Sequence, residues 1–368
     1  MIDRQLVLHI NWYLLGLTVL LFAAGVLNLY SASAFRLSEG TTLNNFYSRQ
    51  LVWGCAGLLA MLLFMIIDYR HFRFLSWYIY IVSLVLLACV FFWGVSIYGA
   101  QRWLSLGFVS FQPSELVKVG VIILTAHVLS NNEHPLKLKD LIKVLIIAII
   151  PVVIVARQPD LGSALVILFI LGGIIVYQGI DRKIVKILLV LLPMLAPLFW
   201  FLLQDYQKTR LLSFINPAQD PLGSGYHVIQ SQIAVGSGGF WGKGFMEGTQ
   251  SQLRFLPEKH TDFAFSVFGE EWGFLGALVL LIIFCAFLYQ VLSASQEAKD
   301  RFGSLLCVGV FFYFFLQIMV NMGMVLGLLP VVGIPLPFIS YGGTSAMVNF
   351  IMVGLVINVS MRRYLFKS

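Results

Sequence analysis

The sequence carries little charge for its length. Of its 368 residues, 11% are charged and 59% are hydrophobic, whereas soluble domains carry about 25% charged residues. The 24 Lys and Arg residues outnumber the 17 Asp and Glu residues, but they stand in short clusters between apolar runs and form no basic stripe. This composition excludes a soluble enzyme, a disordered chain and a nucleic-acid-binding protein.

Cysteine is also scarce. The four cysteines fall inside apolar runs, so we expect small buried side chains, and neither disulfides nor metal ligands, at Cys55, Cys89, Cys285 and Cys307. The chain has no His-Glu-x-x-His sequence, no paired-cysteine motif and no nucleophile elbow. A structural metal site and a serine hydrolase site are therefore not expected.

Long apolar runs are the dominant feature. A helix needs about 20 apolar residues to cross a bilayer, and we count ten such runs, at roughly 12–30, 50–67, 74–94, 112–130, 140–156, 161–178, 184–203, 264–292, 303–327 and 338–361. They do not alternate, which excludes a β-barrel. The first run lacks a cleavage site and is not a removable signal. The predicted fold class is an all-α integral membrane protein, one domain over 1–368 with ten transmembrane helices.

The short connections between these runs differ in charge. Successive connections lie on opposite sides of the membrane and so form two sets. The first set, with the two ends of the chain, holds fourteen basic residues, at Arg4, Arg70, Arg73, Lys137, Lys139, Lys143, Arg182, Lys183, Lys186, Lys299, Arg301, Arg362, Arg363 and Lys367. The other set holds four, at Arg36, Arg49, Arg102 and Arg157. The positive-inside rule places both termini in the cytoplasm and the long 204–263 loop, between the seventh and eighth helices, outside.

The 204–263 loop is long enough to be functional. Its apolar stretch 227–235 is too short to span, so we expect part of the loop to lie on or dip into the membrane interface. Its glycine-rich segment 236–244 contains Gly-Lys, but neither the following Ser or Thr nor the earlier glycine of a phosphate-binding P-loop. Two alternatives remain open for this segment: a flexible hinge, or backbone N–H groups offered to an anion.

Charged residues inside a membrane span are costly and are candidate functional groups. Glu115 and Lys118 in the fourth run share one helix face. They are either an internal ion pair that fixes the helix, or the lining of a water-accessible cavity in which Lys118 meets an anion. Asp160 follows a proline and precedes the sixth run, so we expect a cap or turn role for it.

Asp262 lies where the long loop enters the eighth run. It is either a helix N-cap or a carboxylate whose pKa is tuned by an apolar neighbourhood and by Lys259 and His260. Glu270 and Glu271 follow it on the same run and are expected to be structural. Four histidines are expected to be non-catalytic by position: His9, His71, His127 and His134.

Six ordered blocks of sequence resemble the RodA/FtsW/SpoVE family of bacterial cell-wall polymerases across the whole chain. The strongest block is 321–345, with Gly-Leu-Leu-Pro-Val-Val-Gly-Ile-Pro-Leu-Pro and Ile-Ser-Tyr-Gly-Gly-Thr-Ser inside it. The other five blocks are 99–104, 111–115, 158–162, 248–252 and 260–263. The short tails and the segment 257–260 are more similar to the elongation member than to the division member.

The resemblance implies a peptidoglycan glycosyltransferase of the bacterial inner membrane that polymerises lipid II during cell elongation. It implies a class B penicillin-binding protein and other elongation-complex proteins as partners. It places the family's essential acid on Asp262 and its functional intramembrane pair on Glu115 and Lys118. The expected substrate-binding residues are Lys118, Glu115, Arg49, Arg102, Asp160, Arg210, His260 and Ser340.

The chemistry agrees with that assignment. Joining two lipid-linked sugars removes a proton from a hydroxyl and releases a pyrophosphate, which is already a good leaving group, so one carboxylate is sufficient. Cations or backbone donors must meet the phosphate charge, and Mg²⁺ or Mn²⁺ could bridge it to a carboxylate, although no ligand cluster indicates a metal. Two alternatives are a transporter that flips the lipid-linked precursor and a non-catalytic scaffold.

Overall fold

The computed structural model describes residues 8–33, 46–97, 100–105, 107, 110–131, 135–187, 193–194, 197, 201, 203–215, 224–253, 255–256 and 258–363. Within this part, eight helices are long and apolar enough to cross a membrane: α2 (Trp12–Ala32), α4 (Phe46–Ile66), α5 (Tyr69–Trp93), α6 (Pro113–Ser130), α8 (Leu161–Gln178), α13 (Ala264–Gln296), α14 (Arg301–Val325) and α15 (Gly343–Met361). The chain is therefore a multi-pass membrane protein, as its composition predicts.

The fifth and seventh predicted runs need separate comment. The fifth is the helix α7 (Leu138–Arg157), whose start carries Lys139, Asp140 and Lys143. The seventh, 184–203, falls largely outside the described residues. The other runs match helices to within a few residues, but the total of ten spans stays a prediction.

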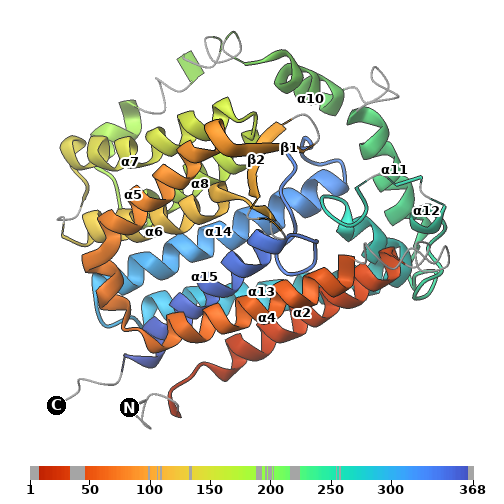
Figure 1. Ribbon diagram of the computed structural model, residues 1–368, viewed down its shortest axis with the longest axis horizontal. Helices are drawn as coiled ribbons and strands as arrows, with labels where there is room; N and C mark the ends of the chain where they lie inside the picture. The colour runs from red at the N-terminus through yellow and green to blue at the C-terminus, as the bar shows by residue number, and fades with distance from the viewer. Residues whose placement is uncertain are drawn as a thin grey trace.

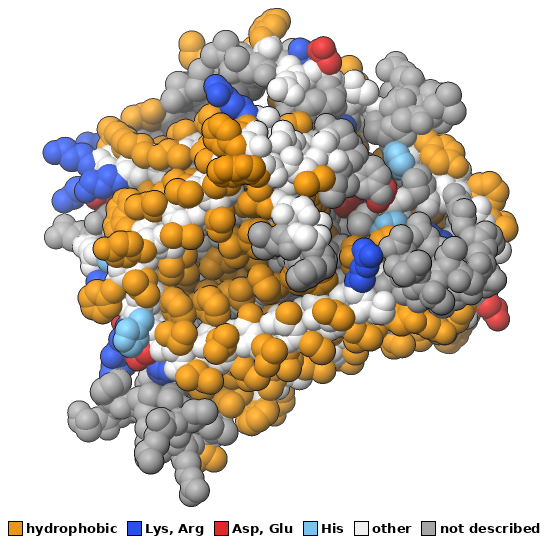
Figure 2. Space-filling model, in the orientation of Figure 1, with side chains coloured by type: hydrophobic (Ala, Val, Ile, Leu, Met, Phe, Trp, Pro, Cys, Tyr) orange, Lys and Arg blue, Asp and Glu red, His pale blue; other side chains and the backbone are white. Residues whose placement is uncertain are grey.

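The bundle is built around α15. Almost every residue of this helix is buried and most are apolar, as expected for a central helix. It packs along α4, while α13 packs on α14, α14 on α8 and α5 on α6 (Figure 1). Apolar side chains cover the outside of the bundle, and Lys and Arg side chains gather at its left end beside α7 (Figure 2). This surface suits a bilayer.

Both ends of the described chain lie at one end of the bundle (Figure 1). Residues 8–13, Ser360 near the end of α15 and Arg363 just after it line one small cavity of about 330 Å³. This placement agrees with both termini being on the same side of the membrane. The opposite end carries the connecting segments α10 (Asp205–Ile215), α11 (Ser224–Ser237) and α12 (Thr249–Gln252).

Three short strands form an antiparallel sheet between α5 and α6. They are β1 (Gly94–Ile97), β2 (Ala100–Ser105) and β3 (Ser110–Phe111), in the order β1-β2-β3.

The apolar stretch 227–235 of the long loop forms most of α11, where Ser231 Oγ donates to the Val325 carbonyl at 2.9 Å. The stretch is thus docked on α13 and α14 by protein contacts.

The last apolar run, predicted from roughly residue 338, becomes helical at Gly343, because 326–342 is a proline- and glycine-rich loop. The prediction that the four cysteines are buried was wrong for three of them. Cys55 and Cys285 are exposed and Cys89 is half-buried, while Cys307 is buried; all four are free thiols. An apolar run does not distinguish a core-facing side chain from a lipid-facing one, because both environments are apolar.

A polar clamp closes the turn between α4 and α5. The Asn358 side-chain amide donates to the carbonyls of Phe64 and Ile67, and its Oδ1 accepts from the backbone N–H of Tyr69 at 3.2 Å. The Arg362 guanidinium donates to the Ile66 carbonyl at 2.7 Å. The last carbonyls of α4, which have no partner inside the helix, are thereby satisfied.

We predict that Asn358→Leu lowers the free energy of unfolding by about 2–4 kcal/mol, because it leaves buried backbone groups of this turn without partners. Thermal unfolding of the purified protein in detergent measures the change. Asn131→Ala, which alters an exposed amide, is the control and should melt within about 1 °C of the unaltered protein. Equal melting of the two variants would contradict the clamp.

Candidate active site at the end of the bundle

A break in α13 shapes the end of the bundle opposite the termini. Gly273 interrupts the helix with φ 63° and ψ −163°, a conformation that favours glycine. The segment 236–244 fills this break: the N–H groups of Lys243 and Gly244 donate to helical carbonyls at 3.1 Å each, and the N–H of Phe274 donates back to the segment at 2.9 Å. The segment is thus a docked loop, and these two N–H groups are used within the protein.

Glu270 anchors the next part of the same loop. Its fully buried carboxylate accepts from Lys243 Nζ at 2.8 Å and Thr249 Oγ1 at 3.2 Å. It also accepts from the backbone N–H groups of Gln250 at 2.9 Å and Ser251 at 3.2 Å, at the start of α12. This use of a carboxylate at a helix N-terminus is favourable, and it gives Glu270 the structural role that the sequence suggested.

Asp262 lies immediately before α13 and is half-buried. The N-cap residue of α13 is Phe263, so the alternative in which Asp262 caps the helix is wrong. The fully buried Asn321 of α14 donates through Nδ2 to the Asp262 carbonyl at 2.9 Å and to the Ile334 carbonyl at 2.8 Å. One amide therefore joins the end of the long loop to the 326–342 loop.

The Asp262 carboxylate lies against Gly333. This glycine has φ 76°, and a Cβ placed on it would be 3.4 Å from Asp262 Oδ2. On its other side the 326–342 loop packs on Gly162, where a Cβ would come within 2.9 Å of the Val332 carbonyl oxygen. The 326–342 loop is therefore held between Asp262 and the start of α8.

Charges from four segments act on Asp262. Burial is the main cause that raises the pKa of its carboxyl group to about 6, and the negative charge of Glu258 adds to the increase. The positive charges of Arg210 and Arg102 oppose the increase, while Asp160 supports it weakly. The structure thus brings together four residues that the sequence proposed separately: Asp262, Arg210, Arg102 and Asp160.

Asp160 and Arg102 also build the framework of the site. Asp160 is the N-cap of α8, accepting from the Ser163 N–H at 3.1 Å, which confirms the expected cap role, and from Gln112 Nε2 at 3.2 Å. Arg102 on β2 donates from Nε to the Gln158 carbonyl at 3.1 Å. These contacts tie the sheet to the turn before α8, so part of the Arg102 guanidinium is already committed to the protein.

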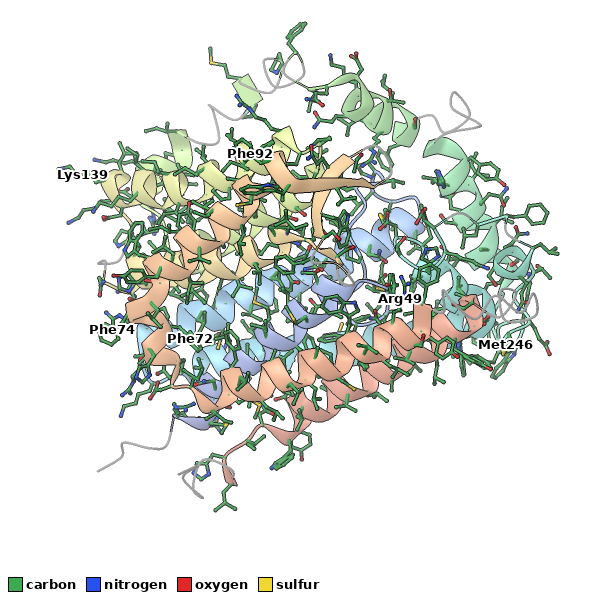
Figure 3. The ribbon with its side chains drawn as sticks, in the orientation of Figure 1. Arg49, Phe72, Phe74, Phe92, Lys139 and Met246 are labelled. Carbon is green, nitrogen blue, oxygen red and sulfur yellow. The ribbon has the colours of Figure 1, made fainter. Side chains whose placement is uncertain are left out.

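His260 lies beside the first turn of α4. Its ring stacks on Phe46 with 3.9 Å between ring centroids, its Nε2 is 3.9 Å from a Glu258 carboxylate oxygen, and its carbonyl accepts from the Tyr341 N–H at 2.8 Å. Arg49 lies on the same turn of α4, at the end of the bundle that also holds Met246 (Figure 3). Figure 2 shows acidic side chains set back between histidine side chains at this end.

Ser340 is held by the protein itself. Its hydroxyl accepts from the Leu336 N–H at 2.9 Å, and its carbonyl accepts from Gln50 Nε2 at 3.3 Å. The buried Gln50 also accepts from the Gly342 N–H at 3.3 Å, so it fixes the end of the 326–342 loop. Sequence reasoning missed Gln50 and the role of Asn321, although an amide inside an apolar run was a usable signal.

Glu115 and Lys118 form an ion pair inside the bundle. Lys118 Nζ is 2.6 Å from Glu115 Oε1, both residues are 3% exposed, and the ammonium lies 5.7 Å from the centroid of the Tyr313 ring. The sequence left two alternatives, an internal ion pair or the lining of a water-accessible cavity. The structure shows the internal ion pair, and Lys118 does not reach the surface. Their assignment to substrate binding stays a prediction.

Comparison with known proteins places the chain in a family. A family model for FtsW, RodA and SpoVE, described as "Cell cycle protein", matches residues 11–365. The chain is 39% identical over 349 residues to the peptidoglycan glycosyltransferase MrdB of Escherichia coli (strain K12), covering 94% of this chain and 93% of MrdB. This chain belongs to the FtsW/RodA/SpoVE family.

Other members of the FtsW/RodA/SpoVE family show the same relationship. The peptidoglycan glycosyltransferase RodA of Treponema pallidum (strain Nichols) is 32% identical, over 95% of this chain and 98% of that one. A chain from a peptidoglycan synthase complex that coordinates polymerization and crosslinking has a TM-score of 0.83 at 31% identity, covering 96% of this chain and 98% of that one. RodA of Thermus thermophilus gives 0.70 at 28% identity, with the same coverage.

The raised pKa predicts a stability change for Asp262→Asn. The folded carboxyl group binds its proton more tightly than an unfolded aspartate with a pKa near 3.9, so its ionisation costs folding free energy as the pH rises from about 4 to 6. We expect the variant to gain about 1–3 kcal/mol of unfolding free energy at pH 7.5, and less at pH 4.5.

Thermal unfolding at pH 4.5, 6.0 and 7.5 measures this gain. Asp205→Asn, which changes a fully exposed carboxylate on α10, is the matched control and should show no such trend. An Asp262→Asn variant that melts no higher than the unaltered protein at pH 7.5 would show that Asp262 ionises without cost.

Proposed function

We propose that this protein is a peptidoglycan glycosyltransferase that polymerises lipid II into glycan strands, with Asp262 as the general base. The observation that carries the proposal is a half-buried carboxylate with a pKa near 6, in a chain of the FtsW/RodA/SpoVE family. Asn321 holds the backbone of this residue, and the positive charges of Arg210 and Arg102 act on its carboxylate. The relatives named peptidoglycan glycosyltransferases cover more than nine-tenths of the chain and support the same activity.

The chemistry needs one proton acceptor. The acceptor sugar hydroxyl gives its proton to the Asp262 carboxylate while its oxygen forms a bond to the donor anomeric carbon. The bond from that carbon to the pyrophosphate oxygen breaks, and the carrier leaves as undecaprenyl pyrophosphate with inversion at the carbon. A carboxyl group with a pKa near 6 is mostly ionised at neutral pH and yet basic enough to accept this proton.

Positive charge must meet the leaving pyrophosphate. Arg102 and Arg210 act on Asp262 and can supply it, with Arg49 and His260 at the rim of the same end. Glu115 and Lys118 would act from inside the bundle, as an ion pair within α6 whose ammonium lies over the Tyr313 ring of α14. Asp160 and Ser340 would act through the backbone that they hold.

A divalent cation fits this arrangement only if the substrate supplies some of its ligands. Among the described residues no three His, Cys, Asp or Glu side chains converge as a metal site. Mg²⁺ or Mn²⁺ would therefore take most of its oxygen ligands from the diphosphate and water, with one carboxylate of the site. The ion would supply charge neutralisation at the leaving group.

The proposed setting is the bacterial inner membrane, with both termini cytoplasmic and Asp262 facing outward. Fourteen basic residues in one set of connections support this orientation. A class B penicillin-binding protein is the proposed partner, since a related chain works in a complex that couples polymerization to crosslinking. Other elongation-complex proteins belong to the same proposal.

Asp262→Asn should abolish polymerisation while leaving a folded protein. We expect glycan synthesis from purified lipid II to fall at least about a hundredfold, because an amide cannot accept the proton. Gel analysis of the glycan product, with the penicillin-binding partner present, measures it, and Asp205→Asn is the control. Normal polymer from Asp262→Asn would remove the base assignment, and precursor translocation without chain growth in the unaltered protein would favour a transporter.

Asn321→Leu should misplace Asp262 without removing it. We expect kcat to fall about ten- to a hundredfold with KM within about threefold, because small errors in the position of a base are costly. Gln178→Leu removes another buried amide at the opposite end of the bundle and should lower stability without changing kcat. An unchanged kcat in Asn321→Leu would contradict the positioning role.

A further inference from the structure

A polar cavity lies at the end of the bundle that carries the termini. It has a volume of about 510 Å³ and is formed where α8 and α13 end and α14 begins. Asp262 lies at the other ends of α13 and α14. Helix α13 begins just after Asp262, and α14 ends beside α11. The cavity is therefore separate from the candidate active site.

The charge on the cavity wall is positive. Lys299 and Arg301 line it together with Asp300, and Lys299 is exposed. The Asp300 carboxylate is already used, because it accepts from the Gly303 N–H at 2.7 Å and from the Tyr69 hydroxyl at 2.8 Å. The lining therefore carries two positive charges against one negative charge, and Arg70 lies 3.9 Å from that negative carboxylate, so the net charge favours an anionic occupant.

Hydroxyl groups line the same wall. Tyr177 at the end of α8 lies with its hydroxyl 3.1 Å from Ser304 Oγ on α14, and both hydroxyls line the cavity. Hydroxyls and ammonium or guanidinium groups together are the donors that bind phosphate oxygens in proteins. An anion with several acceptor oxygens suits this wall better than a single carboxylate.

The apolar surface beside the cavity indicates where the anion comes from. Val176 and Tyr177 are adjacent in the last turn of α8, and they are 70% and 45% exposed. The helix carrying them is long enough to span a bilayer, so its last turn lies at the edge of the hydrocarbon region. Exposed apolar side chains in this last turn give an acyl chain a place to lie while its headgroup enters the cavity.

We propose that this cavity binds the headgroup phosphate of an anionic phospholipid, with Lys299 and Arg301 as the charged contacts and the Tyr177 and Ser304 hydroxyls as further donors. Basic pockets between membrane helices are suited to such headgroups. The site holds α8, α13 and α14 together at one membrane surface, and nothing in it depends on the proposed reaction at the other end.

Native mass spectrometry of the purified protein tests the site. We expect phosphatidylglycerol to be retained about tenfold more tightly than phosphatidylcholine with the same acyl chains. The double variant Lys299→Gln/Arg301→Gln should lose about thirtyfold in phosphatidylglycerol affinity. The control Lys139→Gln/Lys143→Gln removes the same charge at the same end of the bundle, outside the cavity, and should stay within about twofold.

Two further measurements separate lipid binding from misfolding and from binding of free phosphate. Lys299→Gln alone changes an exposed side chain, so it should fold normally and still lose about fivefold. Inorganic phosphate added at the same concentration should not displace the lipid. Equal retention of phosphatidylcholine, an equal loss in the control variant, or displacement by inorganic phosphate would each overturn the assignment to an anionic lipid.

Discussion

The side-chain amide of Asn321 holds the candidate site together. It donates to the carbonyls of Asp262 and Ile334, which belong to two segments far apart in sequence. The bond from the Tyr341 N–H to the His260 carbonyl joins the same two segments. Because Asn321 is fully buried, the amide has no water to compete for its hydrogen bonds. The Asp262 carboxylate lies against Gly333, in the same loop as Ile334, and its burial there is the main cause of its raised pKa.

The same requirement appears wherever the chain leaves regular helix inside the bundle. An unpaired backbone group in an apolar environment is costly, so each irregular point is matched by a polar side chain or a docked loop. Asn358 and Arg362 satisfy the end of α4, and the segment 236–244 satisfies the break at Gly273. Several of the buried polar residues of this very apolar chain therefore satisfy irregular backbone.

The proposed reaction depends on a carboxylate whose basicity is set by its surroundings. A carboxylate that is partly withdrawn from water becomes more basic, and cations on neighbouring segments limit how far its pKa rises. The ion pair of Glu115 and Lys118 shows the other use of charge in the bundle, since each group neutralises its partner at 2.6 Å. The proposed lipid site, with Lys299 and Arg301, places charge at the membrane surface, where a headgroup can meet it.

Apolar periodicity and length determined the class of fold from the sequence alone. Helices α6 and α8 match their predicted runs almost residue for residue, because Pro113 and Asp160 mark their starts. The resemblance of six short blocks indicated the family and pointed to Asp262. Sequence could not tell lipid-facing from core-facing positions, as Cys55 and Cys285 show.

Only the tertiary structure decided which of these residues meet. It brought Arg102, Asp160, Arg210 and Asp262 together, turned Glu270 into a loop anchor, and revealed Asn321 and Gln50 as the residues that fix the loops. The physical reason is that these contacts join segments distant along the chain. Hydropathy reports how far each segment avoids water, whereas the partner of a polar group depends on how the helices pack.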